Sequence, residues 1–196
     1  MMPATDDHLS VMDAIRARRS VRAYSPEELD RSTIEKLLAA AVRAPTAIHE
    51  ESWAFVIVQD RAALERLSDL AKPMFLAAVR RAAADGHRHS FEAFDRPDFN
   101  LFYDAGTLIV ICAKGRGPFV AADCWLAAGN LMLAAVSMGL GTCVIGSALA
   151  ALETAAGKAE AGIPDGVTAV APIIVGVPRG ATPESPRKPP EILSWK

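Results

Sequence analysis

The stretch TLIVICAKGRGPFVAADCWLAAGNLMLAAVSMGLGTCVIG, residues 107–146, holds the two longest apolar segments of the chain. Its first seven residues, Thr107–Ala113, form a continuous apolar run that predicts a strand. Residues 119–138 predict a long helix that is apolar almost all round, interrupted by one aspartate, one asparagine and one serine. A helix of this kind belongs in a core or in an interface between chains.

Capping residues and apolar periodicity predict shorter elements on both sides of this stretch. They are a helix from Val11 to the basic residues 16–19 with the capping pair Ser10 and Asp13, a helix capped by Asp30 that stops near Pro45, a strand at Trp53–Val58, a helix after Asp60 that ends before Pro73, a helix at residues 74–84, a strand at 142–145 bracketed by glycines, a helix opened by Ser147, and a central strand at 167–177. Residues 85–100 show no clear period, as expected of a mobile segment near a pocket.

Composition excludes several classes of protein. The chain has 196 residues, with 21 basic and 23 acidic side chains and a net charge of -2, which argues against bulk nucleic-acid binding and polybasic membrane attachment. The first residues lack a secretory signal, and no run of 18 apolar residues is free of charge or glycine. We expect a cytoplasmic protein with one domain over residues 1–196, with an N-terminal arm at 1–9 and an extended tail at 178–196 that contains five prolines.

The cysteines and histidines do not predict a metal site. Cys112, Cys124 and Cys143 are odd in number, sit among apolar neighbours and form no closely spaced pair. The four histidines do not supply ligands at the spacing that a zinc site needs. We expect three buried, unpaired thiols and no metal.

A cluster of anion-binding side chains follows the first predicted helix. Because the chain as a whole is acidic, concentrating cations here costs self-repulsion, which a bound phosphate would offset through charge-assisted hydrogen bonds. The alternative is a solvated helix end whose cations face the negative pole of the helix dipole. The cluster consists of Arg16, Arg18, Arg19, Ser20 and Arg22.

Two further segments are candidates for contact with a ligand. The polar loop from Ala44 to Trp53 joins a helix to a strand, and its backbone around Thr46 could bond a planar heteroaromatic ring; the alternative is a plain helix stop with Trp53 in the core. The glycines of residues 139–146 permit close approach of a backbone to a ligand. Their spacing is not the dinucleotide-binding fingerprint, and no Walker lysine follows.

Taken together and in this order, these segments resemble the FMN-dependent nitroreductases. The motifs that carry the resemblance are Arg18-Arg19-Ser20-Val21-Arg22, the loop Ala44-Pro45-Thr46 that ends at Trp53, Tyr103-Asp104-Ala105, Asp123, Asn130-Leu131-Met132-Leu133-Ala134-Ala135, and Gly139-Leu140-Gly141-Thr142. The resemblance implies an α+β three-layer sandwich with a mostly antiparallel central sheet flanked by helices. It also implies a homodimer with two FMN molecules at its interface and a C-terminal extension onto the partner subunit.

The resemblance assigns cofactor contacts residue by residue. It implies that Arg18 and Ser20 bind the FMN phosphate and ribityl chain, that Arg19 contributes mainly backbone, and that Arg187 of the tail joins them. Arg22 would face the pyrimidine edge of the ring, with Asn100 a weaker candidate there because Asp98 competes with it. The remaining implied contacts are Pro45, Thr46, Ala47 and His49 from the other subunit, and the backbone of Ile145 and Gly146 near flavin N5 and O4.

The chain departs from the family pattern in the loop. Where the family usually has an asparagine and then Gln-Pro-Trp, this chain has His49 and then Glu51-Ser52-Trp53. The charge of His49 would vary with pH near neutrality, and Glu50 and Glu51 would add negative charge beside an anionic cofactor. Either change could alter flavin affinity or the choice of substrate. The alternative is that these side chains point outward into solvent.

The function implied is hydride transfer by a ping-pong mechanism, from NADH or NADPH to flavin N5 and then to a small-molecule acceptor such as a nitroaromatic or a quinone. No side chain is expected to act as a catalytic acid or base. Residues 74–102 could cover the flavin through Phe91, Phe94, Phe99 and Phe102, although these rings could equally be core. Two other classes stay open: a protein that stores, senses or fragments FMN without NAD(P)H turnover, and an interaction protein without flavin.

Overall fold

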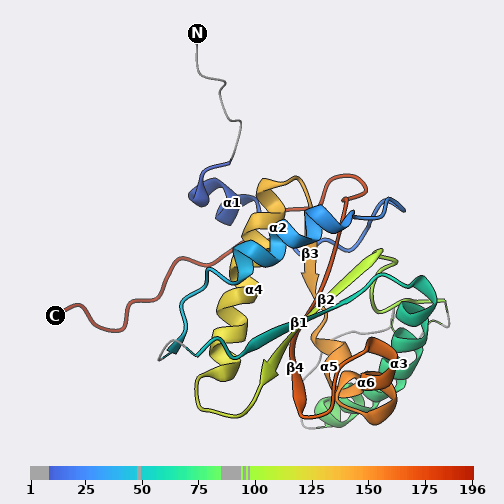
Figure 1. The fold of residues 1–196 in the computed structure, drawn as a ribbon. Helices are drawn as coiled ribbons and strands as arrows, with labels where there is room; N and C mark the ends of the chain where they lie inside the picture. The colour runs from blue at the N-terminus through green and yellow to red at the C-terminus, as the bar shows by residue number, and fades with distance from the viewer. Residues whose placement is uncertain (1–8, 48–49, 85–93, 95, 97) are drawn as a thin grey trace.

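The computed structural model describes residues 9–47, 50–84, 94, 96 and 98–196, and at its centre is a four-stranded sheet (Figure 1). The strand order is β1-β2-β4-β3, and all three neighbouring pairs are antiparallel. The bounds are β1 Trp53–Val58, β2 Thr107–Lys114, β3 Gly141–Val144 and β4 Val167–Gly176. Each strand lies within one residue of its predicted limits, and the antiparallel sheet is confirmed.

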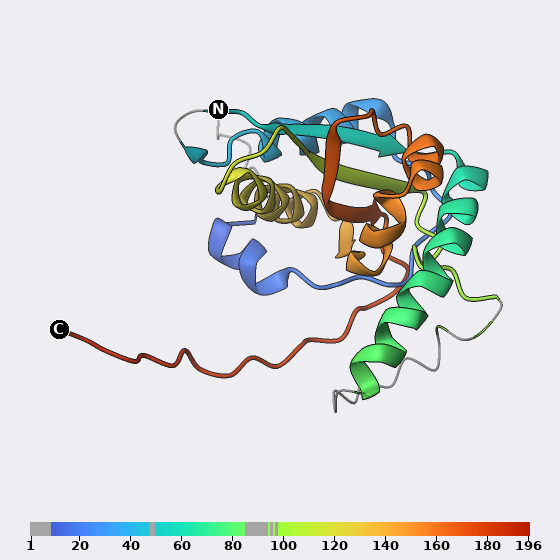
Figure 2. The ribbon, with the colours of Figure 1, turned by 90° about the horizontal axis from the view of Figure 1, so that it is seen from below.

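Helices cover both faces of the sheet, as Figure 2 shows for α4 on one side of the strands and for α3, α5 and α6 on the other. Successive side chains of β2 point into two separate cores: Leu108 and Val110 pack with α3, whereas Ile109 and Ile111 pack with α2 and α4. The α+β three-layer arrangement is therefore confirmed. The helices are α1 Val11–Ala17, α2 Arg31–Ala41, α3 Arg61–Ala84, α4 Val120–Ser137, α5 Leu149–Leu152 and α6 Ala155–Ala161.

The predicted N-terminal caps are present at three helices. The Ser10 side chain accepts a hydrogen bond from the amide of Asp13 at the start of α1. Asp30 accepts one from Thr33 at 2.6 Å, and Asp60 accepts one from Ala62 at 2.8 Å. Caps of this kind satisfy amide groups that have no partner inside the helix, which is why they mark helix starts in the sequence.

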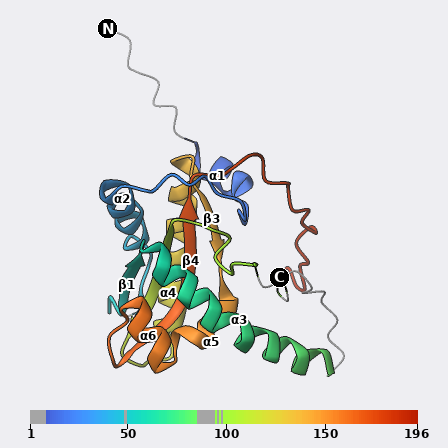
Figure 3. The ribbon, with the colours of Figure 1, turned by 90° about the vertical axis from the view of Figure 1, so that its right-hand side faces the viewer.

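The expectation that one helix ends before Pro73 and another begins at residue 74 was wrong. A single 24-residue helix, α3, runs through Pro73 and extends away from the body of the protein (Figure 3). Proline removes one backbone donor from a helix interior, but strong helix formers such as Ala71 and Met74 flank it, and Leu64 and Leu67 anchor the first half in the core. The side chain of Pro73 is exposed, so its ring lies on the solvent side of the helix.

Replacing Pro73 by alanine is expected to stabilise the protein. The substitution restores an interior helix hydrogen bond, a gain of about 3 kcal/mol that is reduced by about 1 kcal/mol because alanine gives the unfolded chain more freedom. Calorimetry should then show a melting temperature higher by about 4–8 °C. An unchanged or lower melting temperature would show that α3 is not continuous at this position.

The helix expected from Ser147 is divided into three short pieces. A 3₁₀ turn at Gly146–Ala148 leads into α5, and α6 follows after a break. Thr154 causes the break, because its hydroxyl caps α6 by accepting from the amide of Gly157 at 3.0 Å and donates to the carbonyl of Ala151 at 2.7 Å. A Cβ at residue 157 would lie 2.0 Å from that carbonyl oxygen, so the two pieces can meet this closely only at a glycine.

The helix α4 has one buried side and one apolar side that faces solvent. It is long and apolar enough to span a membrane by length and composition, with a mean hydropathy of 1.4, a test that core helices also pass. Seven of its residues are buried, and α4 packs against α2 and against the sheet. Its other side exposes Trp125 and Leu126, next to the exposed N-cap residue Phe119. The buried side agrees with a core helix, and the exposed apolar side agrees with an interface.

The three cysteines are unpaired and buried, as expected. The tail also agrees with expectation, because residues 181–196 form neither helix nor strand (Figure 2). Leu193 and Trp195 of the tail are 89% and 87% exposed. The proline-rich tail therefore has apolar side chains that find no core within this chain. The N-terminal arm predicted at residues 1–9 lies, except for Leu9, outside the described residues.

Candidate functional site

The segment after α1 lies along the edge of the sheet formed by β3. Ser20 forms a parallel bridge with Thr142, and the amide of Val21 donates to the carbonyl of Thr142 at 3.0 Å. On its other side, the carbonyl of Ala23 accepts from the amide of Arg179 at 2.9 Å, where the tail begins. These bonds fix the basic residues of the segment between β3 and the tail.

This arrangement depends on a glycine in β3. A Cβ built on Gly141 would lie 2.7–2.9 Å from three carbon atoms of the Val21 side chain. Real Cβ atoms do not come so close, and Val21 is itself buried. The close approach of the segment to β3 therefore requires residue 141 to be glycine.

A first cavity of about 300 Å³ brings together residues from both ends of the chain. It contains all four residues to which the sequence assigned the phosphate end of the cofactor, and three of them, Arg18, Arg19 and Ser20, are half-buried at the end of α1. The fourth, Arg187, comes from the tail. The cavity is lined by Ile15, Arg16, Arg18, Arg19, Ser20, Glu184, Ser185 and Arg187.

The guanidinium groups of Arg16 and Arg19 are both used within the protein, since Arg16 Nη1 lies 3.2 Å from Oδ1 of Asp13 and Arg19 is bonded on two sides. Arg19 donates to the backbone carbonyls of Arg16 and Arg18, and its Nη2 lies 3.3 Å from Oε1 of Glu184. Through this contact Arg19 links the end of α1 to the tail. Within the described part of the chain, Arg18 and Arg187 are then the cations of the cavity that remain for a bound anion.

A second cavity of about 280 Å³ contains the residues assigned to the ring edge, Arg22, Asn100 and Asp98. The guanidinium carbon of Arg22 lies 5.9 Å from the centre of the Tyr103 ring, a cation–π contact. Asp98 is held by Arg96, with Nη2 2.6 Å from Oδ2. The cavity is lined by Arg22, Ala23, Tyr24, Arg96, Asp98, Phe99, Asn100, Tyr103, Asp104 and Arg179.

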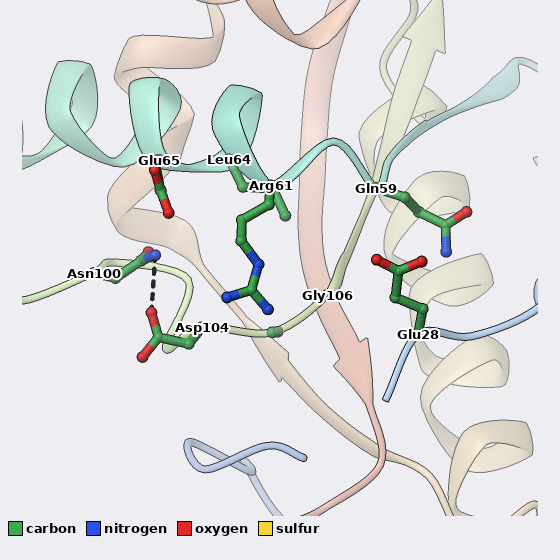
Figure 4. A pocket seen from close by; sticks show the side chains of 9 residues that line it. Glu28, Gln59, Arg61, Leu64, Glu65, Asn100, Asp104 and Gly106 are labelled. Carbon is green, nitrogen blue, oxygen red and sulfur yellow. Dashed lines mark hydrogen bonds between the residues drawn. The ribbon is translucent and has the colours of Figure 1, made fainter. Parts of the chain in front are cut away.

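The side chain of Asn100 is fixed on two sides. Its Nδ2 donates to Oδ1 of Asp104 at 3.2 Å, and its Oδ1 accepts from the amide of Phe102 at 2.8 Å. Figure 4 shows this pair beside a recess into which Arg61 extends from the start of α3. The recess has a volume of about 20 Å³, room for one water molecule at most. The recess is therefore too small to bind a ligand of its own. Asn100 and Asp104 form the wall between it and the second cavity.

The segment after α1 connects the two cavities, because Ser20 lines the first and Arg22, two residues further on, lines the second. Burial raises the pKa of the Cys143 thiol in β3, and the nearby Arg22, Ser20 and Arg18 act in the opposite direction. Arg18 and Ser20 line the first cavity, whereas Arg22 lines the second. One short segment therefore contributes to both cavities, and an extended ligand that follows this segment could reach from one to the other.

Several assigned residues do not line either cavity. Pro45, Thr46 and Ala47 lie at the N-terminal end of α4, where the amide of Ala47 donates to the side chain of Asp123. Ile145 is buried, with its amide bonded to the carbonyl of Pro172 at 2.8 Å. The exposed Gly146 begins the turn that follows β3. His49, also assigned to the site, lies outside the described residues.

The aromatic residues expected in a lid have different environments. Phe102 is completely buried, which confirms the core alternative for this ring. Phe99 lines the second cavity and stacks on Phe94, with ring centres 4.7 Å apart, and on Tyr103 at 5.4 Å. Phe91 lies outside the described part of the chain. Of the three of these phenylalanines that the structure describes, Phe99 is the one that lines the cavity.

Sequence reasoning gave no role to Arg179 or Cys143 in this site, and it did not foresee the backbone of Tyr103 and Asp104. These two residues have φ angles of 53° and 58°, a left-handed conformation that is uncommon for residues other than glycine. Strain of this kind is often stored at functional sites, and both residues line the second cavity. The one sequence feature that pointed to these two residues was the motif Tyr103-Asp104-Ala105.

Comparisons with known proteins agree with this geometry. A model described as Nitroreductase family matches residues 15–177. A Bacillus subtilis protein named FMN reductase (NAD(P)H) is 26% identical over 192 residues, which cover 94% of this chain and 72% of that protein. A relative from Methanothermobacter thermautotrophicus is 30% identical over 137 residues; these cover 68% of this chain and only 59% of the relative.

The fold is also close to that of a solved structure. A crystal structure of a nitroreductase with bound FMN from Bacteroides fragilis matches with a TM-score of 0.80 and 25% identity. The match covers 96% of this chain and all of that one. The likeness therefore extends beyond residue 177, where the family match ends, into the tail.

Proposed function

This chain belongs to the nitroreductase family, and from that premise we propose that it is an FMN-dependent oxidoreductase that takes a hydride from NADH or NADPH and passes it to a flat acceptor by a ping-pong mechanism. Relatives named FMN reductase and the FMN-bound structural neighbour support the flavin and the nicotinamide donor. The observation that carries the proposal is the convergence of Arg18, Ser20 and Arg187 on one cavity.

The donors of the first cavity fit a phosphate ester. Arg18 and Arg187 provide two permanent positive charges with several N–H donors each, and Ser20 adds a hydroxyl. Charge-assisted hydrogen bonds of this type contribute about 1.5–3 kcal/mol each. The family match ends at residue 177, so the role of Arg187 rests on its position in this cavity.

The second cavity is proposed to hold the edge of the ring. Bound FMN would supply the hydride chemistry at its N5 atom. Arg22 would place a positive charge beside the pyrimidine edge, where it stabilises the anionic reduced form, and Asn100 would offer its amide nearby. The exposed backbone of Gly146 would face N5 and O4, with Ile145 behind it, since both backbone groups of Ile145 are bonded within the chain. The protein supplies position and electric field, and no side chain is assigned as an acid or base.

We further propose that the protein is a cytoplasmic homodimer. Most of the exposed large apolar residues lie at α1, at α4 and on the tail, and α1 packs against α4. A second subunit would cover this surface, and residues 45–47 and His49 of the partner subunit would complete each flavin site. The residues of this surface are Val11, Met12, Ile15, Phe119, Trp125, Leu126, Ile192, Leu193 and Trp195.

A protein that stores, senses or fragments FMN is the second candidate, favoured by the unusual residues of the loop. Glu50 and Glu51 are exposed in the chain, in agreement with the alternative that their carboxylates are solvated. That position weakens the argument that they change the chemistry at the ring. The oxidoreductase remains the function that we propose.

Anaerobic titration of the purified protein with NADH and with NADPH tests the proposal. We expect flavin absorption in the visible spectrum, and its loss on addition of about one equivalent of at least one nucleotide. Free FMN mixed with the same nucleotides without protein is the control. Bound flavin that neither nucleotide bleaches would favour the storage candidate, and a protein that stays colourless after incubation with FMN would exclude both.

A further inference from the structure

The helix α4 contains a buried carboxylate among apolar neighbours. Asp123 is only 4% exposed, and the next buried residues of the helix, Cys124, Ala127 and Ala128, are completely buried. A carboxylate in such a place loses its hydration, so it persists where it forms a specific hydrogen bond. An alanine at this position would avoid the free-energy cost of burying a carboxylate, so the presence of aspartate indicates a specific role.

The bond made by Asp123 reaches a distant part of the chain. Its Oδ1 accepts from the amide of Ala47 at 3.2 Å, across 76 positions of sequence. The carbonyl of Ala47 in turn accepts from the amide of Glu50 at 3.2 Å. Both backbone groups of Ala47 are therefore bonded, and the carboxylate attaches the loop between α2 and β1 to the core helix.

A second polar residue of α4 bonds to the helix that precedes this loop. Asn130, seven residues further along and so on the same side of the helix, donates from Nδ2 to the carbonyl of Ala40 at 3.3 Å. The third polar residue, Ser137, bonds to the carbonyl of Ala134 within its own helix. Two of the three polar residues that interrupt the apolar helix thus bond to backbone outside α4: Asn130 to the last turn of α2, and Asp123 to the loop that follows it.

We propose that Asp123 is a positioning residue that fixes the loop at residues 44–47 so that it can contact the flavin of the other subunit. The inference rests on the proposed function, because that function gives the loop its target. The inference goes beyond that function because it names the carboxylate that fixes the position of the loop. A catalytic backbone must be held to a fraction of an ångström, and a bond to a rigid buried helix supplies that precision.

The competing explanation is that Asp123 only stabilises the start of α4. It lies in the first turn, where a negative charge favours the helix dipole, and the N-cap residue Phe119 makes no side-chain capping bond. On this account the loss of Asp123 would lower stability without affecting the loop. The two explanations predict different results for the same set of variants.

The test uses Asp123→Ala, Asp123→Asn and, as the matched control, Asn130→Ala, which removes the bond from α4 to the last turn of α2. We expect Asp123→Ala to weaken FMN binding about tenfold and to speed hydrogen exchange of the Ala47 amide in the flavin-free protein by at least tenfold. Asp123→Asn keeps an oxygen acceptor and should recover most of both. Asn130→Ala should lower the melting temperature while changing FMN affinity less than twofold.

A lower melting temperature in Asp123→Ala with unchanged FMN affinity and unchanged exchange at Ala47 would overturn the inference in favour of the helix-start explanation. Faster exchange with unchanged affinity would overturn it too, because the loop would then be held without serving the flavin. Failure of the unmodified protein to bind FMN is a separate result, seen before any variant is made, and it would overturn the proposed function.

Discussion

Replacing Arg18 by alanine should lower the affinity for FMN by about 10- to 100-fold, the loss expected when one charge-assisted contact of about 1.5–3 kcal/mol is removed. Arg18 is half-buried in the first cavity, and with the described residues it forms no ion pair like the one between Arg19 and Glu184. Equilibrium titration of the flavin-free protein, followed by flavin fluorescence, measures the change.

Arg16→Ala is the matched control for this prediction. Arg16 lines the same cavity and carries the same charge, but its side chain is 69% exposed and its Nη1 lies 3.2 Å from Oδ1 of Asp13. It should therefore change FMN affinity only about twofold or less, as expected of a screened surface charge. Riboflavin, which lacks the phosphate, should bind the Arg18 variant as well as it binds the unmodified protein. Unchanged FMN affinity in Arg18→Ala would remove this arginine from the site.

Replacing Gly141 by alanine should damage stability and flavin binding together. The new methyl would overlap the branched side chain of Val21, which is buried and cannot rotate away freely. Relief requires the segment with Ser20 and Arg22 to move away from β3, so residues of both cavities are displaced. Overpacking of this kind costs about 1–3 kcal/mol, and we expect FMN affinity to fall about tenfold.

Thermal unfolding and FMN titration of three variants test this prediction. Gly106→Ala is the control, because its Cβ would lie 3.9 Å from the nearest atom, an ordinary contact. The double variant Gly141→Ala/Val21→Ala restores the missing space and should recover part of the lost affinity. A Gly141→Ala protein with unchanged stability and unchanged affinity would refute the close approach of the segment to β3.

Much of the fold could be predicted because its signals are local. The capping hydrogen bonds of Ser10, Asp30 and Asp60 each span two or three residues, and the strands alternate or run apolar over a few positions. The predicted break at Pro73 was wrong because interactions beyond the local sequence decide whether the helix continues. A local rule for proline was applied where the strong helix-forming residues on both sides, and the anchoring of Leu67 in the core, outweigh it.

The site was predicted less evenly. Arg18 and Ser20 are neighbours in a visible cluster, so residue types alone suggested an anion, whereas Arg187 came from the resemblance and the structure then placed it in the same cavity. The nearness of the Cys143 thiol to Arg22 and Ser20 depends on packing that no spacing reveals. The Asp123 side chain was visible as an interruption of an apolar helix, but its partner 76 residues away was not.

The central claim is that the two cavities are the ends of one FMN site, and diffraction from crystals grown with FMN tests it directly. The account predicts the phosphate in contact with Arg18, Ser20 and Arg187, and the pyrimidine edge of the ring beside Arg22. It also predicts residues 45–47 of the partner subunit against the ring. Density for the phosphate beside Arg22, or a flavin bound away from both cavities, would contradict it.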